Sequence, residues 1–386
     1  MVSILRVFPF FLLALAMFIN PQEVVHSAGN GLSLWWNYVL PALLPFFILS
    51  ELLLASGFVH FMGVLLEPLM RPVFRLPGQA SFVVAMSLTS GIPIGAILTT
   101  KLRKENILTK AEGERLLAFT CNPSPGFMLG AVASSMLLRP ELGLILVASV
   151  YLGNMLVGII FRFYGPKDRP APSSSHPSWQ KALTELQKAQ NQDSKPFGQV
   201  FGEAVRHSVN TILLVGGFIV FFTVLVHLLH HYQITKWLAT GLHHLSGGLI
   251  SAQAVSTLIA GLLETTLGCR TVIDSFSGLN LQVGLLAAVL GWGGLSTFAQ
   301  VASFTSTTDL KFAPFLIGRT LHTVFALILS QIFFNLLKTP VFHLSLIPGP
   351  SGFWETWQMS SWVFCGIMLV LVLLGFGVRT YWKNNM

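Results

Sequence analysis

The chain of 386 residues is 53% hydrophobic and only 10% charged, with a mean hydropathy of +0.69 and a formal net charge of +8. Soluble domains carry about 25% charged residues, so this composition excludes an ordinary soluble protein and predicts an all-α polytopic membrane protein in contact with the lipid bilayer. The positive charge lies in short loops between apolar runs, which indicates membrane topology and argues against a nucleic-acid partner.

Apolar runs of spanning length recur along the whole chain. We expect about eight transmembrane helices, which cover residues 4–20, 34–58, 115–138, 142–163, 208–231, 283–306, 312–337 and 361–378. The first run follows Arg6 and precedes Ser27 and Ala28, a pattern that also fits a cleaved signal peptide. We favour a retained helix.

Two further apolar stretches, 80–100 and 250–276, either span the membrane once or enter it and return as a re-entrant hairpin. The loops on both sides of 80–100 are basic, and a single span would put one of them on the wrong face under the positive-inside rule. We therefore predict a hairpin there. The flanks of 250–276 are nearly uncharged, so a hairpin is favoured but a span stays open. This topology places both termini and most of the 23 basic residues in the cytoplasm.

These elements divide the chain into five predicted parts. Two repeats, each with the order helix, hairpin, broken helix and helix, start from opposite faces of the membrane and form an inverted repeat. The parts are an N-terminal transmembrane helix with an outer loop (1–33), the first repeat (34–164), a cytoplasmic linker (165–206), the second repeat (207–338) and a C-terminal transmembrane helix (339–386).

The linker contains one segment with helical periodicity. Trp179, Leu183 and Leu186 recur at helical spacing among charged residues, which predicts an amphipathic helix. Such a helix either lies on the cytoplasmic membrane surface or joins the repeats as a solvated segment.

Four polar stretches interrupt the apolar runs at matching places in the two repeats, at 90–96, 121–127, 264–270 and 291–298. Broken helices at corresponding positions of two halves indicate the substrate site of a secondary transporter. Backbone breaks at membrane depth are tolerated only where protein or a water-filled cavity surrounds them. We therefore expect the substrate-binding residues in these stretches.

In the first hairpin, Ser90, Gly91, Pro93 and Gly95 prevent a continuous helix. The tip would direct backbone N–H groups and a helix N-terminus at an anionic ligand. The alternative is a proline kink that only shapes packing.

In the following helix, Asn122, Pro123 and Ser124 stand before another proline, so two backbone donors are missing and the helix must unwind. The carbonyls that lose their partners can bind a ligand or a cation, and the Asn122 and Ser124 side chains add donors and acceptors. The alternative is a structural bend in which Asn122 bonds the released carbonyls.

In the second hairpin, Glu264, Thr265, Thr266 and Arg270 are the candidates, because an ionisable group at membrane depth is a functional hypothesis by default. Arg270 could hold a carboxylate in bidentate geometry. The alternative is a Glu264–Arg270 pair that fixes the hairpin.

In the last broken helix, three glycines precede Ser296 and Gln300, which complete the predicted site. Glycines in membrane helices also serve close helix packing, and that alternative stays open. Two more ionisable residues, Glu51 and Arg319, fall at membrane depth, and we expect them to pair across the repeats.

The sequence contains no catalytic-triad order, phosphate-binding loop or dinucleotide fingerprint. The three cysteines lie in apolar stretches without metal-ligand spacing. We therefore expect neither an enzyme nor a bound cofactor or metal. A homo-oligomer stays open.

The order of three motifs resembles the nucleoside-recognition (Gate) domain family, and within it the sporulation membrane proteins of endospore-forming bacteria. The motifs are VLPALLPFF at 39–47, SGIPIGA at 90–96 and CNPSPGF at 121–127. The resemblance implies a fold similar to concentrative nucleoside transporters, with hairpins and unwound helices around a midplane site.

The resemblance also implies a function in spore maturation and cortex formation. The expected activity is transport of dipicolinic acid, a small dianion, across the outer forespore membrane by alternating access, with Glu264 as a conceivable proton carrier. The alternatives are transport of a nucleoside or another small metabolite, and a sporulation scaffold that transports nothing.

Overall fold

The computed structural model describes residues 2–166, 179–192, 195–245 and 251–337. Within these ranges every element of regular secondary structure is a helix, as the composition predicts. Four helices are long and apolar enough to cross a membrane, or up to six if each of two bent helix pairs counts as one span. The structure therefore supports fewer spans than the predicted eight, and the predicted span at 361–378 lies outside the described residues.

The N-terminal part is more helical than predicted. α1 (Val2–Ile19) is followed by α2 (Pro21–Leu34), which continues through a π-helical turn, η1 (Trp35–Val39), into α3 (Leu40–Ala55). Pro21 starts α2 after a bend of 102°, and proline suits the first turn of a helix because the N–H it lacks has no partner there. The predicted outer loop is thus mostly helix α2.

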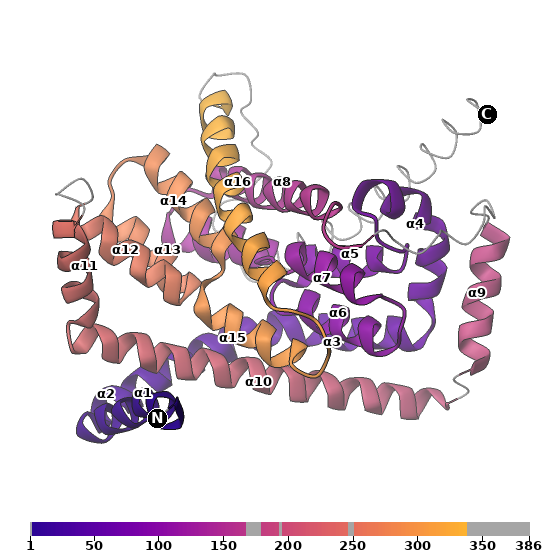
Figure 1. The fold of residues 1–386 in the computed structure, drawn as a ribbon, viewed down its shortest axis with the longest axis horizontal. Coiled ribbons are helices and arrows are strands. Elements are labelled where there is room, and N and C mark those ends of the chain that lie inside the picture. Colours follow the sequence, from indigo (N-terminus) through magenta and orange to yellow (C-terminus); the bar gives the residue numbers. More distant parts are fainter. Residues whose placement is uncertain (1, 167–178, 193–194, 246–250, 338–386) are drawn as a thin grey trace.

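Two runs of helices follow the same order. The first comprises α3, α4 (Phe58–Phe74), α5 (Ala80–Ser90), α6 (Ile94–Lys104), α7 (Lys110–Phe119), η2 (Phe127–Met136), η3 (Pro140–Leu142) and α8 (Gly143–Phe161). The second comprises α10 (Phe197–His231), α11 (Ile234–Leu245), α12 (Ala252–Leu263), α13 (Thr265–Ser275), α14 (Leu279–Trp292), α15 (Gly294–Thr305) and α16 (Ala313–Leu337). Figure 1 shows α4 to α7 toward one end of the molecule, α11 to α13 toward the other, and α10 along one edge.

Both stretches that the sequence marks as possible hairpins form helical hairpins. α5 and α6 have 11 residues each, and α12 and α13 have 12 and 11. One arm is therefore about 17 Å long, roughly half of the ~30 Å hydrocarbon layer. The two arms of each pair pack against each other. The open alternative of one continuous span at 250–276 does not occur, because the backbone of Glu264 is extended between the arms.

The two helices after the hairpins are broken where proline and glycine fall. Residues 120–124 are not helical, because Pro123 and Pro125 supply no N–H and disfavour helical backbone before them. Between α14 and α15, Gly293 and Gly294 have φ values of +89° and +76°, which glycine adopts without steric strain. Each break exposes backbone groups that a continuous helix would pair.

The linker is shorter than expected, because α10 already begins at Phe197. The predicted amphipathic helix is present as α9 (Trp179–Gln192), and it packs on α4. Its Trp179 ring meets the Phe61 ring edge-to-face, with 5.1 Å between the centroids. α9 is therefore docked on the first repeat, an arrangement that neither sequence alternative describes.

α16 packs on α7, α8 and α14, and its C-terminal end projects beyond the other helices in Figure 1. Small residues permit this approach: a Cβ at Gly318 would lie 2.4 Å from the Ala118 carbonyl oxygen of α7, and one at Gly153 of α8 would lie 3.1 Å from the Ala326 nitrogen. α16 thus contacts the broken helix of each repeat.

An ion pair joins the two repeats beside the base of the first hairpin. Arg103, near the end of α6, donates to both carboxylate oxygens of Asp309 in the loop before α16, at 2.9 and 3.0 Å. Two residues on, the Lys311 backbone N–H donates to the Glu114 carboxylate of α7 at 2.9 Å. The hydrogen bonds from Arg103 lower the pKa of the Asp309 carboxyl from its ordinary value of 3.8.

This pair predicts a pH-dependent stability. Because folding lowers the pKa of Asp309, the pair stabilises the folded protein above pH 3.8, and the stabilisation is lost as the pH falls through the lowered pKa. Asp309 is 48% exposed, so the effect is at most about 1 kcal/mol. We expect Asp309→Asn to have a lower melting temperature than the wild type at neutral pH. At strongly acidic pH the two melting temperatures should be equal.

Melting temperatures of the detergent-purified proteins across this pH range test the prediction. Glu141→Gln is the matched control, because Glu141 is exposed and its pair with Arg139 is long, at 3.7 Å. A difference between Asp309→Asn and wild type that persists at the lowest pH would contradict the prediction.

Candidate functional site

The tip of the first hairpin lies directly on the break of the first repeat. A Cβ at Gly95 would lie 1.6 Å from the Thr120 carbonyl oxygen, and one at Gly91 would lie 3.0 Å from the backbone nitrogen and Cβ of Ser124. Gly91 also needs its positive φ of +84° for the turn. Glycine at these positions therefore lets the hairpin touch the unwound backbone.

The second hairpin makes the equivalent contact with the second break. The Thr265 hydroxyl donates to the Gly293 carbonyl at 2.6 Å, and a Cβ at Gly294 would lie 3.1 Å from the Glu264 Cα. The two arms of this hairpin also pack closely against each other, because a Cβ at Gly268 would lie 2.4 Å from the Gly261 Cα. The predicted hairpins and breaks are thus brought together pair by pair.

Arg319 of α16 connects the two breaks. Its side chain is fully buried. Nη1 donates to the Cys121 carbonyl at 2.5 Å, in the first repeat, while Nε and Nη2 donate to the carbonyls of Trp292 and Leu290 at 3.0 and 3.1 Å, in the second. One guanidinium therefore satisfies carbonyls that both unwound helices release, and the four polar stretches form one centre.

Neutral side chains complete the pairing in the first repeat. The Nδ2 groups of Asn122 and of Asn154 on α8 both donate to the Phe119 carbonyl at the end of α7. The Tyr151 hydroxyl lies within hydrogen-bonding distance of the carbonyls of Leu88 and Pro123, at 2.5 and 3.2 Å. This bears out the bend alternative for Asn122, which does bond a released carbonyl. It also leaves the Asn122 Oδ1, which is buried, without a partner.

The first tip and α15 carry further polar groups that have no hydrogen-bond partner within the described residues. The Ser90 hydroxyl at the end of α5 is one of them. On α15, Ser296, Thr297 and Gln300 are 6%, 5% and 6% exposed. Within the described residues none of these three side chains makes a hydrogen bond. Because buried polar groups are normally paired, such unpaired groups indicate a place where a polar solute could bind.

The electrostatics of the centre favour an anion. α6 and α15 begin here and contact each other, and neither N-terminus has a side-chain cap. A helix N-terminus carries a partial positive charge and unpaired N–H groups. The opposite, carbonyl-bearing ends of α7 and α14 are bound by Arg319 and the amides, so their negative charge is neutralised. Positive ends therefore remain to face a solute.

Arg270 does not join this centre. Its side chain is 58% exposed and pairs with Asp274 one turn further along α13, with 2.9 Å between Nε and Oδ2. The Glu264–Arg270 pair, given above as the alternative, is not formed, because the Glu264 carboxylate instead accepts from the Leu267 N–H at 2.7 Å and caps α13. Thr266 is half-buried beside it.

The expected pair of Glu51 with Arg319 is also wrong. Glu51 of α3 binds Lys101 of α6 at 2.8 Å, within the first repeat. Arg319 lies against carbonyls, and within the described residues it has no carboxylate partner. The predicted residues Pro93 and Ser124 do lie at the first tip and break, where the Ser124 hydroxyl accepts from the Phe127 N–H at 3.2 Å.

Sequence reasoning missed three residues that act at the centre. Arg319 was noticed but given the wrong partner, and Tyr151 and Asn154 were not singled out. The last two are polar residues within the otherwise apolar span 142–163, and that rarity was the available signal.

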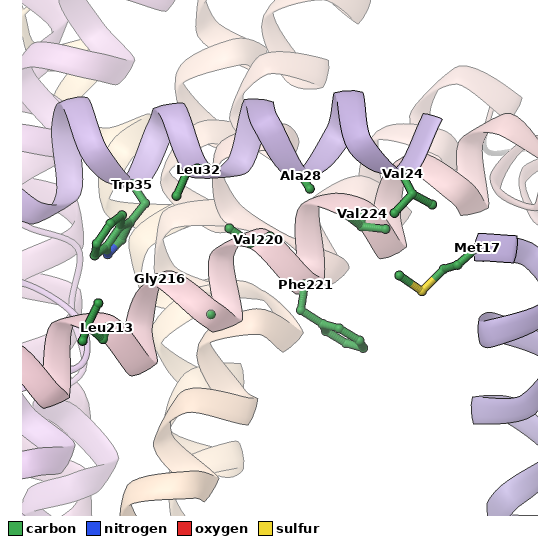
Figure 2. A pocket seen from close by; sticks show the side chains of 11 residues that line it. Met17, Val24, Ala28, Leu32, Trp35, Leu213, Gly216, Val220, Phe221 and Val224 are labelled. Atoms are coloured by element: carbon green, nitrogen blue, oxygen red, sulfur yellow. The ribbon is translucent and has the colours of Figure 1, made fainter. Parts of the chain in front are cut away.

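A cavity of about 450 Å³ lies elsewhere, between α2 and α10. Figure 2 shows its lining, which is apolar apart from one indole: Met17, Val24, Ala28, Leu32, Trp35, Leu213, Gly216, Gly217, Val220, Phe221 and Val224. The indole N–H of Trp35 is already bonded to the Ile212 carbonyl at 3.0 Å. This cavity therefore offers nothing to recognise a polar solute, and the candidate site is the centre around Arg319.

Comparison with known proteins agrees with this architecture. Residues 37–167, essentially the first repeat, match the Gate family model, described as nucleoside recognition. Together with the long apolar helices, the match defines the class: an integral membrane protein with a nucleoside-recognition region.

The chain belongs to the family of the sporulation integral membrane protein YlbJ. It is 41% identical over 347 residues to that protein of Bacillus subtilis (strain 168), which covers 88% of this chain and 84% of the relative. It is also 29% identical over 157 residues to an uncharacterized protein of Alkalihalophilus pseudofirmus, which covers 39% of this chain and 32% of that protein. No solved structure matches, so the likeness to concentrative nucleoside transporters stays a prediction.

The contact between the first tip and the first break predicts a severe effect of one added methyl group. Gly95→Ala would place a carbon 1.6 Å from the Thr120 oxygen, and the hairpin would have to move. We expect a loss of about 3 kcal/mol or more, at the upper end of overpacking effects, measured as a lowered melting temperature or absence of folded protein.

Gly202→Ala on α10 is the matched control, because nothing lies within 4 Å of its added Cβ. Alanine favours a helix by about 1 kcal/mol over glycine, so this variant should be at least as stable as the wild type. If Gly95→Ala melted like Gly202→Ala, the close contact would be disproved.

The second tip predicts a smaller effect. Thr265→Val keeps the shape of the side chain but removes its bond to the Gly293 carbonyl, which should lower the free energy of unfolding by about 1 to 3 kcal/mol. Thermal unfolding in detergent measures the loss. Thr266→Val is the control next in sequence, since the Thr266 side chain makes no hydrogen bond within the described residues. Equal effects of the two substitutions would refute the assigned role of Thr265.

Proposed function

We propose that this chain is a secondary transporter of a small anionic metabolite, that it acts in sporulation, and that its substrate is dipicolinic acid. The carrying observation is that two hairpin tips and two helix breaks meet around Arg319. Broken helices at corresponding places in two repeats typically form the substrate site of such transporters.

The polar character of the centre supports an anionic solute. Uncapped N-termini of α6 and α15, the guanidinium of Arg319 and the unpaired groups of Ser296 and Gln300 supply donors, and the neighbouring Glu264 carboxylate is engaged in capping α13. Dipicolinate, which the family resemblance implies, is a small rigid dianion, so a site rich in N–H groups suits both of its carboxylates.

The burial of the centre supports alternating access. Asn122 and Arg319 are fully buried, and Ser296 and Gln300 are nearly so. A solute can reach them only if a hairpin or a repeat moves. The hairpin tips touch the breaks through a few contacts and are short elements, so they are the proposed moving parts.

The proposed cellular location follows from the family to which the chain belongs. The relative is named a sporulation integral membrane protein, and we place this chain in the outer forespore membrane with both termini in the cytoplasm. The solute would be moved without chemical change, so no enzymatic activity is proposed.

A nucleoside transporter is the second candidate, because the matched family model is described as nucleoside recognition. Nucleosides are neutral, so the donors around Arg319 would bind hydroxyl and carbonyl groups instead of carboxylates. The two candidates differ in the charge of the solute.

Uptake by liposomes that contain the purified protein tests the proposal. We expect uptake of labelled dipicolinate, unaffected by an excess of uridine. In the double variant Ser296→Ala, Gln300→Ala, dipicolinate uptake should fall by about tenfold or more. The variant removes two donors but breaks no hydrogen bond within the described protein. Ser303→Ala, on the same helix, is the matched control and should transport normally.

Each other outcome identifies an alternative. Uptake of uridine but not of dipicolinate would establish the nucleoside transporter. No uptake of either solute by folded wild-type protein would leave the non-transporting scaffold and sink the proposal. Normal uptake by the double variant would remove α15 from the site.

A further inference from the structure

Arg319 carries a buried charge that has no counter-ion among the residues the structure describes. Its side chain is 0% exposed, and no ion pair involves it in the part of the chain that the structure describes. A guanidinium has five N–H donors, and the carbonyls of Cys121, Leu290 and Trp292 take up three of them. Two donors and the full charge therefore remain.

Such an arrangement is unfavourable unless an anion joins it. Burial of an ion removes its hydration, and carbonyl dipoles replace only part of it. Two cations on the hairpins are paired with carboxylates: Lys101 binds Glu51 at 2.8 Å, and Arg270 binds Asp274 at 2.9 Å. Arg319 differs from both in having neutral partners alone.

Gly293 brings the start of α15 close to the Arg319 guanidinium. Gly293 has no side chain, and a Cβ built there would lie 3.2 Å from Arg319 Nη2 and 3.6 Å from Thr297 Cγ2. The guanidinium and the start of α15 thus face one point. Thr297 and Gln300 are three residues apart, so they share one face of α15.

We propose that Arg319 is the charge-recognising residue of the transport site and that it binds a carboxylate of the solute. The Thr297 hydroxyl and the first turn of α15 complete the contact. The inference rests on the proposed function and deepens it: the substrates are small carboxylates, and the charge selectivity comes from Arg319 and not from Arg270.

A carboxylate bonds a guanidinium more strongly than a carbonyl does, because both groups are charged. Arg319 can accept this partner with its two remaining N–H groups while it still holds the carbonyls of both breaks. Its role as a bridge between the repeats and its role toward the solute are therefore compatible, and the second can be measured apart from the first.

Three ligands built on one pyridine ring separate charge recognition from folding. Pyridine-2,6-dicarboxylate is a dianion, pyridine-2-carboxylate is a monoanion, and pyridine-2,6-dicarboxamide is neutral. Their dissociation constants are measured on the full-length protein in detergent by calorimetry. We expect the wild type to prefer the dianion, and Arg319→Gln to lower the preference for the dianion over the diamide by about tenfold or more. A purely structural residue would weaken all three ligands alike.

Further variants make the result specific. Arg319→Lys keeps the charge and should keep part of the preference. Arg139→Gln, at an exposed site, is the control and should bind like the wild type. Arg270→Gln tests the other candidate arginine against Arg319. Loss of the preference there, with an unchanged preference in Arg319→Gln, would overturn the assignment.

Thr297→Val covers the case in which Arg319→Gln does not fold. The Thr297 hydroxyl makes no hydrogen bond within the described residues, so replacing it with a methyl group should leave the melting temperature unchanged. It should weaken the dianion about tenfold or more. Wild-type affinity in this variant, or equal binding of dianion and diamide by the wild type, overturns the inference. A wild type that binds none of the three ligands overturns the proposed substrate instead.

Discussion

A carbonyl without a hydrogen-bond partner is unfavourable in a hydrocarbon layer, because no water is present to replace the lost bond. In the part of the chain that the structure describes, two hairpin tips and two breaks interrupt the helices around Arg319. Each interruption releases carbonyls, and the structure depends on pairing them. Arg319 pairs three of them from two repeats at once. The close contacts at Gly95 and Gly294 follow from this requirement, since the tips must lie against the broken backbone to exclude gaps.

The two repeats solve the same problem with different chemistry. In the first, proline unwinds the helix, and the neutral side chains of Asn154 and Tyr151 reach the released carbonyls. In the second, two glycines unwind the helix, a charged side chain binds the carbonyls, and Glu264 caps the returning arm. The repeats therefore share an order of elements but not an electrostatic character. The second repeat supplies both the buried Arg319 and the Glu264 residue that lies against the start of α15.

The hairpins and the breaks were predicted from the sequence because their causes are local. Positive charge on both sides of 80–100 indicated the first hairpin, and the prolines at 123 and 125 placed the first break to within a residue or two. The partners of the charged residues were predicted poorly. Arg319 and Cys121 are 198 residues apart and meet only because α16 crosses α7, and no local pattern contains that crossing. The Arg270–Asp274 pair could have been predicted from the sequence, since residues four apart share a helix face. Its neglect made Arg270 look more available to a solute than it is.

α10 has 35 residues and extends along one edge of the molecule (Figure 1). A straight helix of this size is about 52 Å long, against ~30 Å of hydrocarbon. Its first turns carry Glu203 and Arg206, and Lys195 and Gln199 bind the Glu203 carboxylate at 2.8 and 2.9 Å, so this end belongs to water. α10 also packs on α2 and α3. Its packing on these neighbours constrains how far α10 tilts, so a bilayer of another thickness would act on the first repeat through the same contacts.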